Sequence, residues 1–341
     1  MSKWAITPPL TPAEAKVRTT FPQPPGWAYE PKWDGFRAVA WGGPDPRLDS
    51  RNHRPLLRYF PELEEPLAAL RDRAVIDAEI VVVLGDVTNF DALQLRIHPA
   101  SSRIRMLATE TPAELVAFDL LALGDEDLRT SPFRDRRRRL HEFVGEPKPP
   151  WHLTPTTEDL DEAKKWFETF EQAGCDGIVA KNLDLSYREG KRDMVKIKHR
   201  RTADAVVGGY RLHKEGDRVG SLLLGMYDTE GSLHFIGHCS GFSDEDRVRL
   251  LELFSELATD ASFGEDARQP GAPSRWSSDR DAAFIAVEPR IVVEVSYDQI
   301  TGGRFRHATR FERWRPDKDA SACTLDQIER PTGVGFSEVV A

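Results

Sequence analysis

Residues 29–41 read YEPKWDGFRAVAW and contain the first candidate functional residue of the chain. Within it, Lys32 lies among aromatic and apolar residues, two positions before the pair Asp34-Gly35. A lysine attacks an electrophile only as the neutral amine, and partial desolvation or a neighbouring cation lowers its pKa from about 10.4. We therefore predict that Lys32 is a nucleophile with a lowered pKa, beside a tight turn that aims the Asp34 carboxylate at a ribose or a metal. A lone Lys-x-Asp-Gly motif more often has a structural role, so the choice between a structural and a catalytic role depends on the other polar residues of the chain.

Two apolar strands further along the chain carry candidate ligand-binding residues. The segment VIDAEIVVV (75–83) places Glu79 in an apolar strand, where a charge is costly unless it is paired or coordinates a ligand. The segment LVAFDLLAL (115–123) places Phe118 in mid-strand, where its ring can stack on a purine. The alternative for both residues is a core role, as a satisfied glutamate and a packed ring.

Cations accompany these strands. Arg51 follows an early strand and offers a fixed positive charge suited to phosphate. The strand MVKIK (194–198) alternates, so that Lys196 and Lys198 share one face. Two lysines on one face of an apolar strand need anions as partners.

A last buried strand, CDGIVAK (175–181), has Asp176 near one end and Lys181 at the other. With the residues above, this gives the equipment for nucleotidyl transfer: carboxylates for a divalent metal, cations for phosphates, and a ring for the base. The sequence contains no Walker A loop, dinucleotide-binding fingerprint, nucleophile elbow or zinc-ligand spacing that would favour another chemistry.

The order and spacing of these segments resemble the covalent nucleotidyltransferase superfamily and, within it, the ATP-dependent DNA ligases. The closest likeness is to the small bacterial type, of which the mycobacterial ligase C group is an example. A later segment resembles the family's final motif. The segments that carry the resemblance are KWDGFR (32–37), SRN (50–52), DAEI (77–80), FDLL (118–121), DGIVAK (176–181), KIK (196–198) and RPDK (315–318).

The resemblance implies an α+β fold in two domains. Residues 1–199 would form a nucleotidyltransferase (ATP-grasp-like ligase) domain with antiparallel sheets and flanking helices, and residues 200–341 an OB-fold β-barrel domain. The pattern favours a small barrel independently, because the composition changes near residue 200 and short strands follow, with an Asp-Thr-Glu-Gly turn at 228–231. One helix is expected among these strands, from Ser243 to about Ala258, followed by a Pro/Gly/Ser-rich stretch at 268–278 and by a basic strand over 304–314. In the first domain, we expect a loop over residues 1–28 and a helix over 157–173.

Site roles follow from the resemblance alone. It makes Lys32 the residue that attacks the α-phosphate of ATP to form lysyl-AMP, with Lys196 and Lys198 on that phosphate. The family usually has glutamate at the position of Asp176, and we expect the shorter aspartate to retain activity. The remaining implied roles are adenine contacts by Glu30 and Phe118, ribose contacts by Arg37 and Glu79, a phosphate contact by Arg51, metal binding by Asp176, and orientation of pyrophosphate by Arg315, Asp317 and Lys318 in the first step only, through a domain swing.

Composition limits the class of protein. The chain has 341 residues, 40% of them hydrophobic and 30% charged, which excludes disordered and collagen-like chains. Its net charge is −9, from 47 basic and 56 acidic residues, so any attraction to nucleic acid must be local. Candidate basic patches are residues 304–318, the run RDRRRR (134–139), read first as solvated surface, and the region 188–192. No apolar run approaches a membrane span, and three distant cysteines fit a reducing cytoplasm.

The expected partner is nicked double-stranded DNA, gripped through its backbone with strong salt dependence and little sequence preference. The expected cofactors are ATP and a divalent metal, Mg²⁺ or Mn²⁺. We expect a cytoplasmic monomer without membrane attachment that works in DNA repair, with repair proteins as candidate partners. The alternatives are an RNA ligase, a capping-type nucleotidyltransferase, or a non-catalytic nucleic-acid-binding protein with a decayed nucleotide site.

Overall fold

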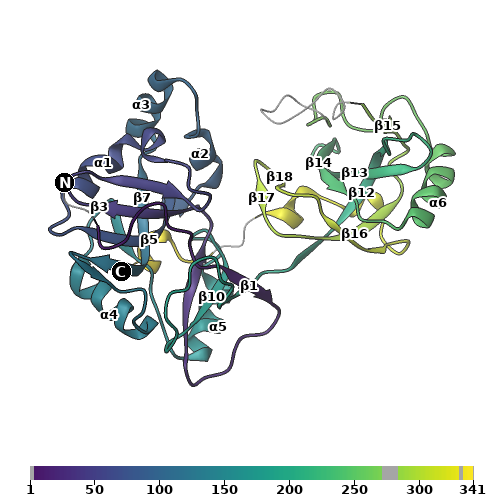
Figure 1. The fold of residues 1–341 in the computed structure, drawn as a ribbon. Coiled ribbons are helices and arrows are strands. Elements are labelled where there is room, and N and C mark those ends of the chain that lie inside the picture. The colour runs from purple at the N-terminus through teal and green to yellow at the C-terminus, as the bar shows by residue number, and fades with distance from the viewer. Residues whose placement is uncertain (1–3, 271–282, 330–332, 341) are drawn as a thin grey trace. The chain divides into compact units, whose positions relative to one another are not determined.

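The computed structural model describes residues 4–270, 283–329 and 333–340, and the chain forms two compact units (Figure 1). The first unit is Met1–Lys198 together with Arg330–Ala341, and the second is His199–Glu329. The expected domain boundary at 199/200 lies one residue from the observed division. The expectation that the whole remainder belongs to the barrel is wrong for the C-terminal segment. That segment returns to the first unit because its Phe336 and Val339 are buried in an apolar cluster there.

Two sheets form the first unit. One has the order β1-β11-β10-β2, and the other has the order β4-β3-β5-β7-β8, with β6 paired to β5 and β9 to β7. All pairs are antiparallel except β1 with β11 and β7 with β9. The strands are β1 (Ala15–Arg18), β2 (Trp27–Trp33), β3 (Phe36–Gly42), β4 (Arg47–Ser50), β5 (Ala74–Leu84), β6 (Val87–Thr88), β7 (Ala113–Leu123), β8 (Glu126–Asp127), β9 (Trp151–Leu153), β10 (Cys175–Asn182) and β11 (Met194–Lys198).

Helices flank these sheets, as the α+β prediction required. The largest apolar cluster of the first unit joins side chains of β3, β5 and β7 to those of α1, α2 and α4. The helices are α1 (Glu64–Ala68), α2 (Phe90–Leu95), α3 (Ser101–Glu110), α4 (Phe133–Val144), α5 (Leu160–Thr169) and α8 (Phe336–Val339), with 3-10 helices η1 (Leu57–Tyr59) and η2 (Pro61–Leu63).

The predicted strands of the first unit are confirmed, and MVKIK has the predicted bounds. Val195 and Ile197 of that strand are buried, while its lysines lie on the other face. The helix expected over 157–173 is shorter, because the Asp159 side chain caps the backbone N–H groups of residues 161 and 162 and starts the helix there. The loop expected over residues 1–28 contains β1, a strand of four mostly exposed residues, AKVR, which is held by backbone pairing with β11.

The second unit is the predicted barrel. Its sheet has the order β14-β13-β12-β16-β19, and a parallel bridge between Cys239 and Thr309 joins the end of β14 to the residue before β19. A helix lies between the third and fourth barrel strands in chain order, as in an OB-fold. The elements are β12 (Arg201–Leu212), β13 (Val219–Tyr227), β14 (Leu233–Cys239), α6 (Asp244–Ser255), β15 (Ile285–Ala286), β16 (Val292–Tyr297), β17 (Ile300–Thr301), β18 (Arg304–Phe305), β19 (Arg310–Trp314), η3 (Ala320–Ala322) and η4 (Leu325–Ile328).

Two expectations about this unit need comment. The basic segment 304–314, expected as one strand, is divided into β18 and β19, because Ile300 pairs with Phe305 in a tight hairpin before the chain joins the barrel. Most of the Pro/Gly/Ser-rich stretch expected at 268–278 lies outside the described residues.

Candidate active site

Lys32 lies at the centre of the site on β2. Its Nζ is 2.6 Å from Oδ1 of Asp176 on the neighbouring strand β10. The other oxygen of this carboxylate, Oδ2, lies 3.1 Å from Nζ of Lys198 on β11. One buried carboxylate therefore joins two of the three lysines that the sequence predicted to act together.

A bulge in β10 places Asp176 there. The register between β10 and β2 shifts between Cys175, which pairs with Trp33, and Ile178, which pairs with Pro31. Gly177 within the bulge has φ of 149°, and a Cβ at this position would lie 2.0 Å from the carbonyl oxygen of Ile197. Only glycine fits at this position, so the backbone requires Gly177 directly after Asp176.

The predicted pKa direction for Lys32 is wrong. Burial disfavours its ammonium form, but the Coulombic attraction and hydrogen bond of Asp176 outweigh burial, and the pKa of Lys32 lies above its ordinary value. Burial likewise favours the neutral form of Asp176, yet Lys32 and Lys198 together lower the pKa of this carboxyl. The pairing with Asp176 thus favours the ammonium form of Lys32, the predicted nucleophile.

Lys196 has the environment that was expected for Lys32. Burial comes first among the causes that lower its pKa, followed by repulsion from Lys32 and Lys198. Arg51, in the exposed turn after β4, adds to this repulsion. The site therefore concentrates positive charge, which suits a polyphosphate.

Glu79 and Arg37 face each other across β5 and β3, where they are register partners. The Glu79 carboxylate accepts a hydrogen bond from the Gly35 N–H at 3.2 Å. Burial, only partly offset by Lys32 and Arg37, raises the pKa of Glu79 to about 8. Arg37 donates two hydrogen bonds, of 2.9 and 2.6 Å, to Asp77, and its guanidinium lies 5.3 Å from the centre of the Phe118 ring.

A second group of residues surrounds the Phe118 ring. Nζ of Lys181 lies 4.6 Å from the ring centre and 2.7 Å from Oε2 of Glu30. Thr156 donates a hydrogen bond of 3.2 Å to Oε1 of the same glutamate. Glu30 and Lys181 are both buried, so the predicted adenine contacts form one connected cluster with a lysine that the sequence had placed on a strand end without a role.

The run RDRRRR is not simply solvated surface. Arg136 is buried and donates to Asp119 at 2.8 and 2.9 Å. Arg137 is also buried, with its Nη1 atom 4.0 Å from Oε1 of Glu30. Within the described residues, Nη1 and Nε of Arg137 have no hydrogen-bond partner.

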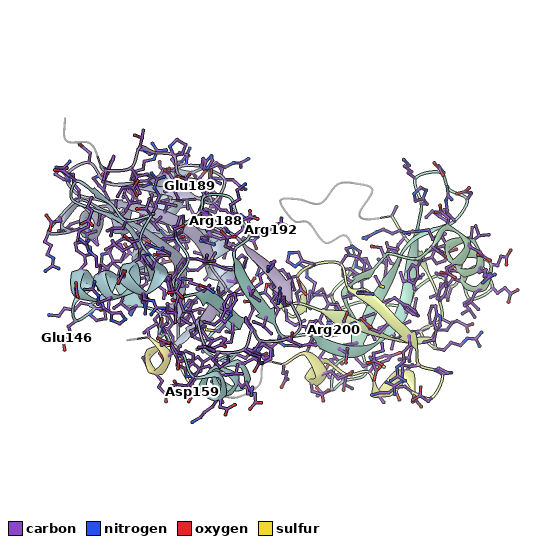
Figure 2. The ribbon with its side chains drawn as sticks, turned by 60° about the horizontal axis from the view of Figure 1, so that its bottom comes forward. Glu146, Asp159, Arg188, Glu189, Arg192 and Arg200 are labelled. Carbon is purple, nitrogen blue, oxygen red and sulfur yellow. The ribbon has the colours of Figure 1, made fainter. Side chains whose placement is uncertain are left out.

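The loop between β10 and β11 carries charge to the surface of the first unit, where Figure 2 labels Arg188, Glu189 and Arg192. Arg188 pairs with Asp193 at 2.6 Å, and Arg192 pairs with Glu14 at 3.0 Å. Local acids therefore partly neutralise this predicted basic patch.

The predicted pyrophosphate-orienting residues belong to the second unit, and two of them meet at one carboxylate. Arg315 donates to both oxygens of Asp204, at 2.8 and 2.9 Å, and Lys318 lies 3.2 Å from Oδ2 of the same residue. Asp317 accepts a 2.9 Å hydrogen bond from Arg315. Asp204 thus links Arg315 and Lys318.

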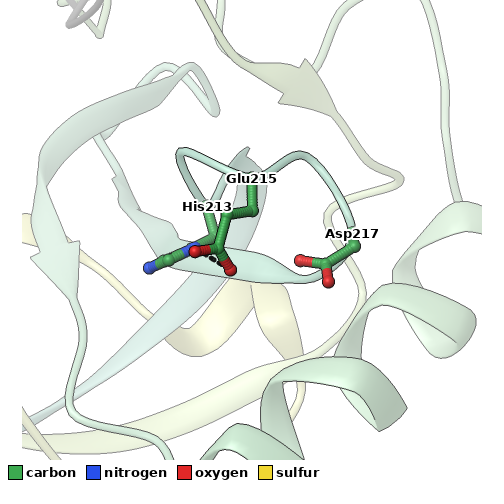
Figure 3. A group of neighbouring side chains, drawn as sticks. All are labelled: His213, Glu215 and Asp217. Carbon is green, nitrogen blue, oxygen red and sulfur yellow. Dashed lines mark ion pairs between the residues drawn. The ribbon is translucent and has the colours of Figure 1, made fainter.

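A divalent metal was predicted at Asp176, whose carboxylate oxygens are ligands of the kind that magnesium and manganese prefer. Asp34 and Glu79 also act electrostatically on Lys32, but within the described residues the three carboxylates do not form a compact group. The described residues contain one compact group of three metal-binding side chain types, His213, Glu215 and Asp217. This group lies in the loop between β12 and β13 (Figure 3), where Arg218 pairs with both acids, and it includes none of the predicted ligands.

An antiparallel nucleotidyltransferase domain with this lysine site, followed by an OB barrel, is the architecture of the covalent nucleotidyltransferases. Residues 8–198 match the family described as ATP dependent DNA ligase domain, and residues 215–318 match ATP dependent DNA ligase C terminal region. The chain belongs to the ATP-dependent DNA ligase family. In the described part of the chain, no helix has both the length and the apolar character needed to cross a membrane.

The chain is similar to known DNA ligases over nearly its full length. The chain is 48% identical to DNA ligase C2 of Mycolicibacterium smegmatis, with 96% of each chain covered. It is 46% identical to DNA ligase C of Mycobacterium tuberculosis, with 98% of each covered. A solved structure from a study of Lig E DNA ligases has a TM-score of 0.54 and 17% identity, and the match covers 91% of this chain and 100% of that one. This last likeness supports the fold.

Proposed function

We propose that this enzyme seals nicks between a 5′-phosphate and a 3′-hydroxyl in double-stranded DNA, through lysyl-AMP and adenylated DNA. The observation that carries the proposal is the contact of Lys32 with Asp176, which also holds Lys198. Attack by the Lys32 amine on the α-phosphorus of ATP breaks the bond to pyrophosphate. AMP then passes to an oxygen of the 5′-phosphate and regenerates the lysine. The 3′-hydroxyl finally attacks that phosphate, joins the strand and releases AMP.

The described contacts support separate roles for the two parts of the site. The cluster of Glu30, Phe118 and Lys181 offers a ring face and paired charges for adenine. The ribose would be held by Arg37 and Glu79. Positive charge from Arg51, Lys196 and Lys198 would neutralise phosphates, and Arg315 and Lys318 would orient pyrophosphate in the first step.

Lys32 must lose a proton before it attacks, and its pairing with Asp176 opposes that loss. A divalent cation held by Asp176 would compete with the ammonium group for the carboxylate and favour the neutral amine. Lys196 and Lys198 act in the same direction, because a nearby positive charge disfavours a second one.

We further propose that the substrate is nicked DNA gripped through its backbone, that the enzyme works in DNA repair as a cytoplasmic monomer, and that repair proteins deliver the nick. The bacterial relatives named above are DNA ligases with the same extent of chain, which supports the substrate class.

Label transfer tests the covalent mechanism. The protein is incubated with α-labelled ATP or GTP and a divalent metal, then denatured, and the label remaining on the chain is measured. Label from ATP that is acid-labile and absent in Lys32→Ala supports lysyl-AMP, whereas label from GTP favours a capping enzyme. Lys164→Ala is the matched control, since its side chain is exposed and pairs locally with Asp161. If neither ATP nor GTP labels the protein, the proposal is overturned, provided that intact mass shows no AMP already bound.

A further inference from the structure

The C-terminal segment, residues 333–340, is fastened to the first unit by specific contacts. The Phe336 N–H donates a 2.6 Å hydrogen bond to the carbonyl oxygen of Asp86. The Asp86 carboxylate accepts hydrogen bonds from the Ser337 N–H at 2.8 Å and from the Ser337 hydroxyl at 2.9 Å. Gly335 allows this approach, because a Cβ there would lie 1.9 Å from the Asp86 carboxylate. These contacts define one docked position.

Once docked, Phe336 is buried between two rings of the first unit. Its ring centre lies 5.4 Å from that of Trp33 and 5.0 Å from that of His152, both in edge-on geometry. Trp33 is itself fixed, because its indole N–H donates to the Thr154 hydroxyl at 2.9 Å. Phe336 thus contacts a side chain whose orientation is already set.

The position of this contact relative to the nucleophile is the important point. Trp33 follows Lys32, and Cys175 precedes Asp176; Trp33 and Cys175 are register partners that share one apolar cluster with Phe336. Successive side chains of β2 point to opposite faces, so Trp33 and Lys32 lie on opposite faces of this strand. The segment packs on the Trp33 face, and Asp176 meets Lys32 on the other.

We propose that the C-terminal segment positions the Lys32–Asp176 pair from the opposite face of the sheet, with Phe336 as the positioning residue. Asp176 lies in a bulge, where the regular pairing between β10 and β2 is interrupted. Packing of Phe336 in the apolar cluster that contains Cys175 therefore fixes the Asp176 carboxylate against the Lys32 amine. This inference rests on the proposed function, in which Lys32 is the nucleophile. It assigns to residues that follow the barrel a role in the chemistry of the first unit.

The test compares Phe336→Ala with Phe143→Ala in the full chain. Phe143 is also a buried ring of the first unit, but it belongs to the cluster between α4 and the larger sheet. The readouts are the maximal rate of lysyl-AMP formation, its half-saturating ATP concentration and the thermal unfolding midpoint. We expect Phe336→Ala to lower the maximal rate about tenfold and to change half-saturation less than about twofold, since small misplacements of a nucleophile cost rate rather than binding.

Two further variants separate positioning from stability. Phe336→Leu keeps an apolar side chain at the site and should recover at least about half of the wild-type rate. Ser337→Ala loses a hydroxyl contact with Asp86 and should lower the rate in the same direction, about two- to threefold. Phe143→Ala should keep the wild-type rate below its unfolding temperature.

The inference is overturned if Phe336→Ala forms lysyl-AMP at the wild-type rate. It is also overturned if Phe336→Ala and Phe143→Ala each lose rate in proportion to their loss of stability. The wild-type protein in the same assay distinguishes the two levels of argument. If it takes no label and its intact mass shows no bound AMP, the proposed function fails; if it is labelled and Phe336→Ala behaves identically, only the positioning role fails.

Discussion

The Lys32 ammonium and the Asp176 carboxylate form a 2.6 Å ion pair at the meeting point of β2 and β10. The predicted nucleophile is therefore bound to the predicted metal ligand, and the two roles are linked through one contact. A cation that binds the Asp176 carboxylate in place of Lys32 would remove the contact that favours the ammonium form of Lys32. This makes the charge state of Lys32 a measurable consequence of the geometry.

Asp176→Asn should make Lys32 more reactive toward an amine-acylating reagent in the absence of nucleotide. Loss of the carboxylate leaves burial, which lowers the pKa of Lys32, and removes the strongest of the contacts that raise it, so that only the weaker attraction of Glu79 and Asp34 opposes burial. At a pH below the pKa of Lys32, each unit by which this pKa falls raises the neutral fraction of the amine about tenfold. The measurement is competitive acylation at pH 8 followed by peptide mass spectrometry, with the exposed Lys164 as internal reference. Equal reactivity in both proteins would contradict the pairing, and Asp176→Glu should resemble the wild type.

Glu79→Gln should stabilise the protein increasingly as pH rises from 6 to 9. The folded pKa of Glu79 is raised to about 8 from an ordinary 4.5, so the folded state favours the protonated carboxyl and wild-type stability declines as pH rises through this window. Glutamine does not ionise and escapes this loss, and we expect a gain on the order of 1–2 kcal/mol over the range. Urea unfolding at both pH values measures it. Glu146→Gln, an exposed change, should show no pH-dependent gain.

Lys181→Met should weaken ATP binding at least about tenfold, because it removes the cation from the buried carboxylate of Glu30 beside the Phe118 ring. Calorimetry with ATP in a Lys32→Ala background measures binding without chemistry. Lys181→Arg keeps the charge and should lose less. Unchanged affinity in Lys181→Met would place adenine elsewhere.

Much of this site follows from strand alternation. Because Lys196 and Lys198 flank buried Ile197, their common face could be predicted without a structure. The raised pKa of Lys32 could not, since it depends on which carboxylate reaches the amine, and that is decided by a bulge in the register between β10 and β2.

The basic run on α4 shows a signal that was available and unused. Phe133, Arg136, Arg137 and Leu140 follow helical spacing and form the buried face of α4, so two arginines of an apparently solvated run lie inside. The return of Phe336 to Trp33 has no such signal, because their contact joins residues about three hundred positions apart through a short segment with little pattern.

The segment RPDK (315–318) allows the formation of lysyl-AMP to be tested separately from the sealing of the nick. Arg315 and Lys318 share Asp204 in the second unit and are proposed to act only while pyrophosphate leaves. Arg315→Ala should therefore reduce lysyl-AMP formation about 100-fold or more, as expected for loss of a cation that stabilises phosphoryl transfer. Sealing of a nick that already carries AMP on its 5′-phosphate should stay within about threefold of wild type, because that step involves no pyrophosphate. The control is Arg313→Ala, which removes an exposed arginine of β19 that lies two residues before Arg315 and pairs with Glu294 of β16. Equal losses in both assays would mean that Arg315 supports the barrel through Asp204 and has no separate part in the first step.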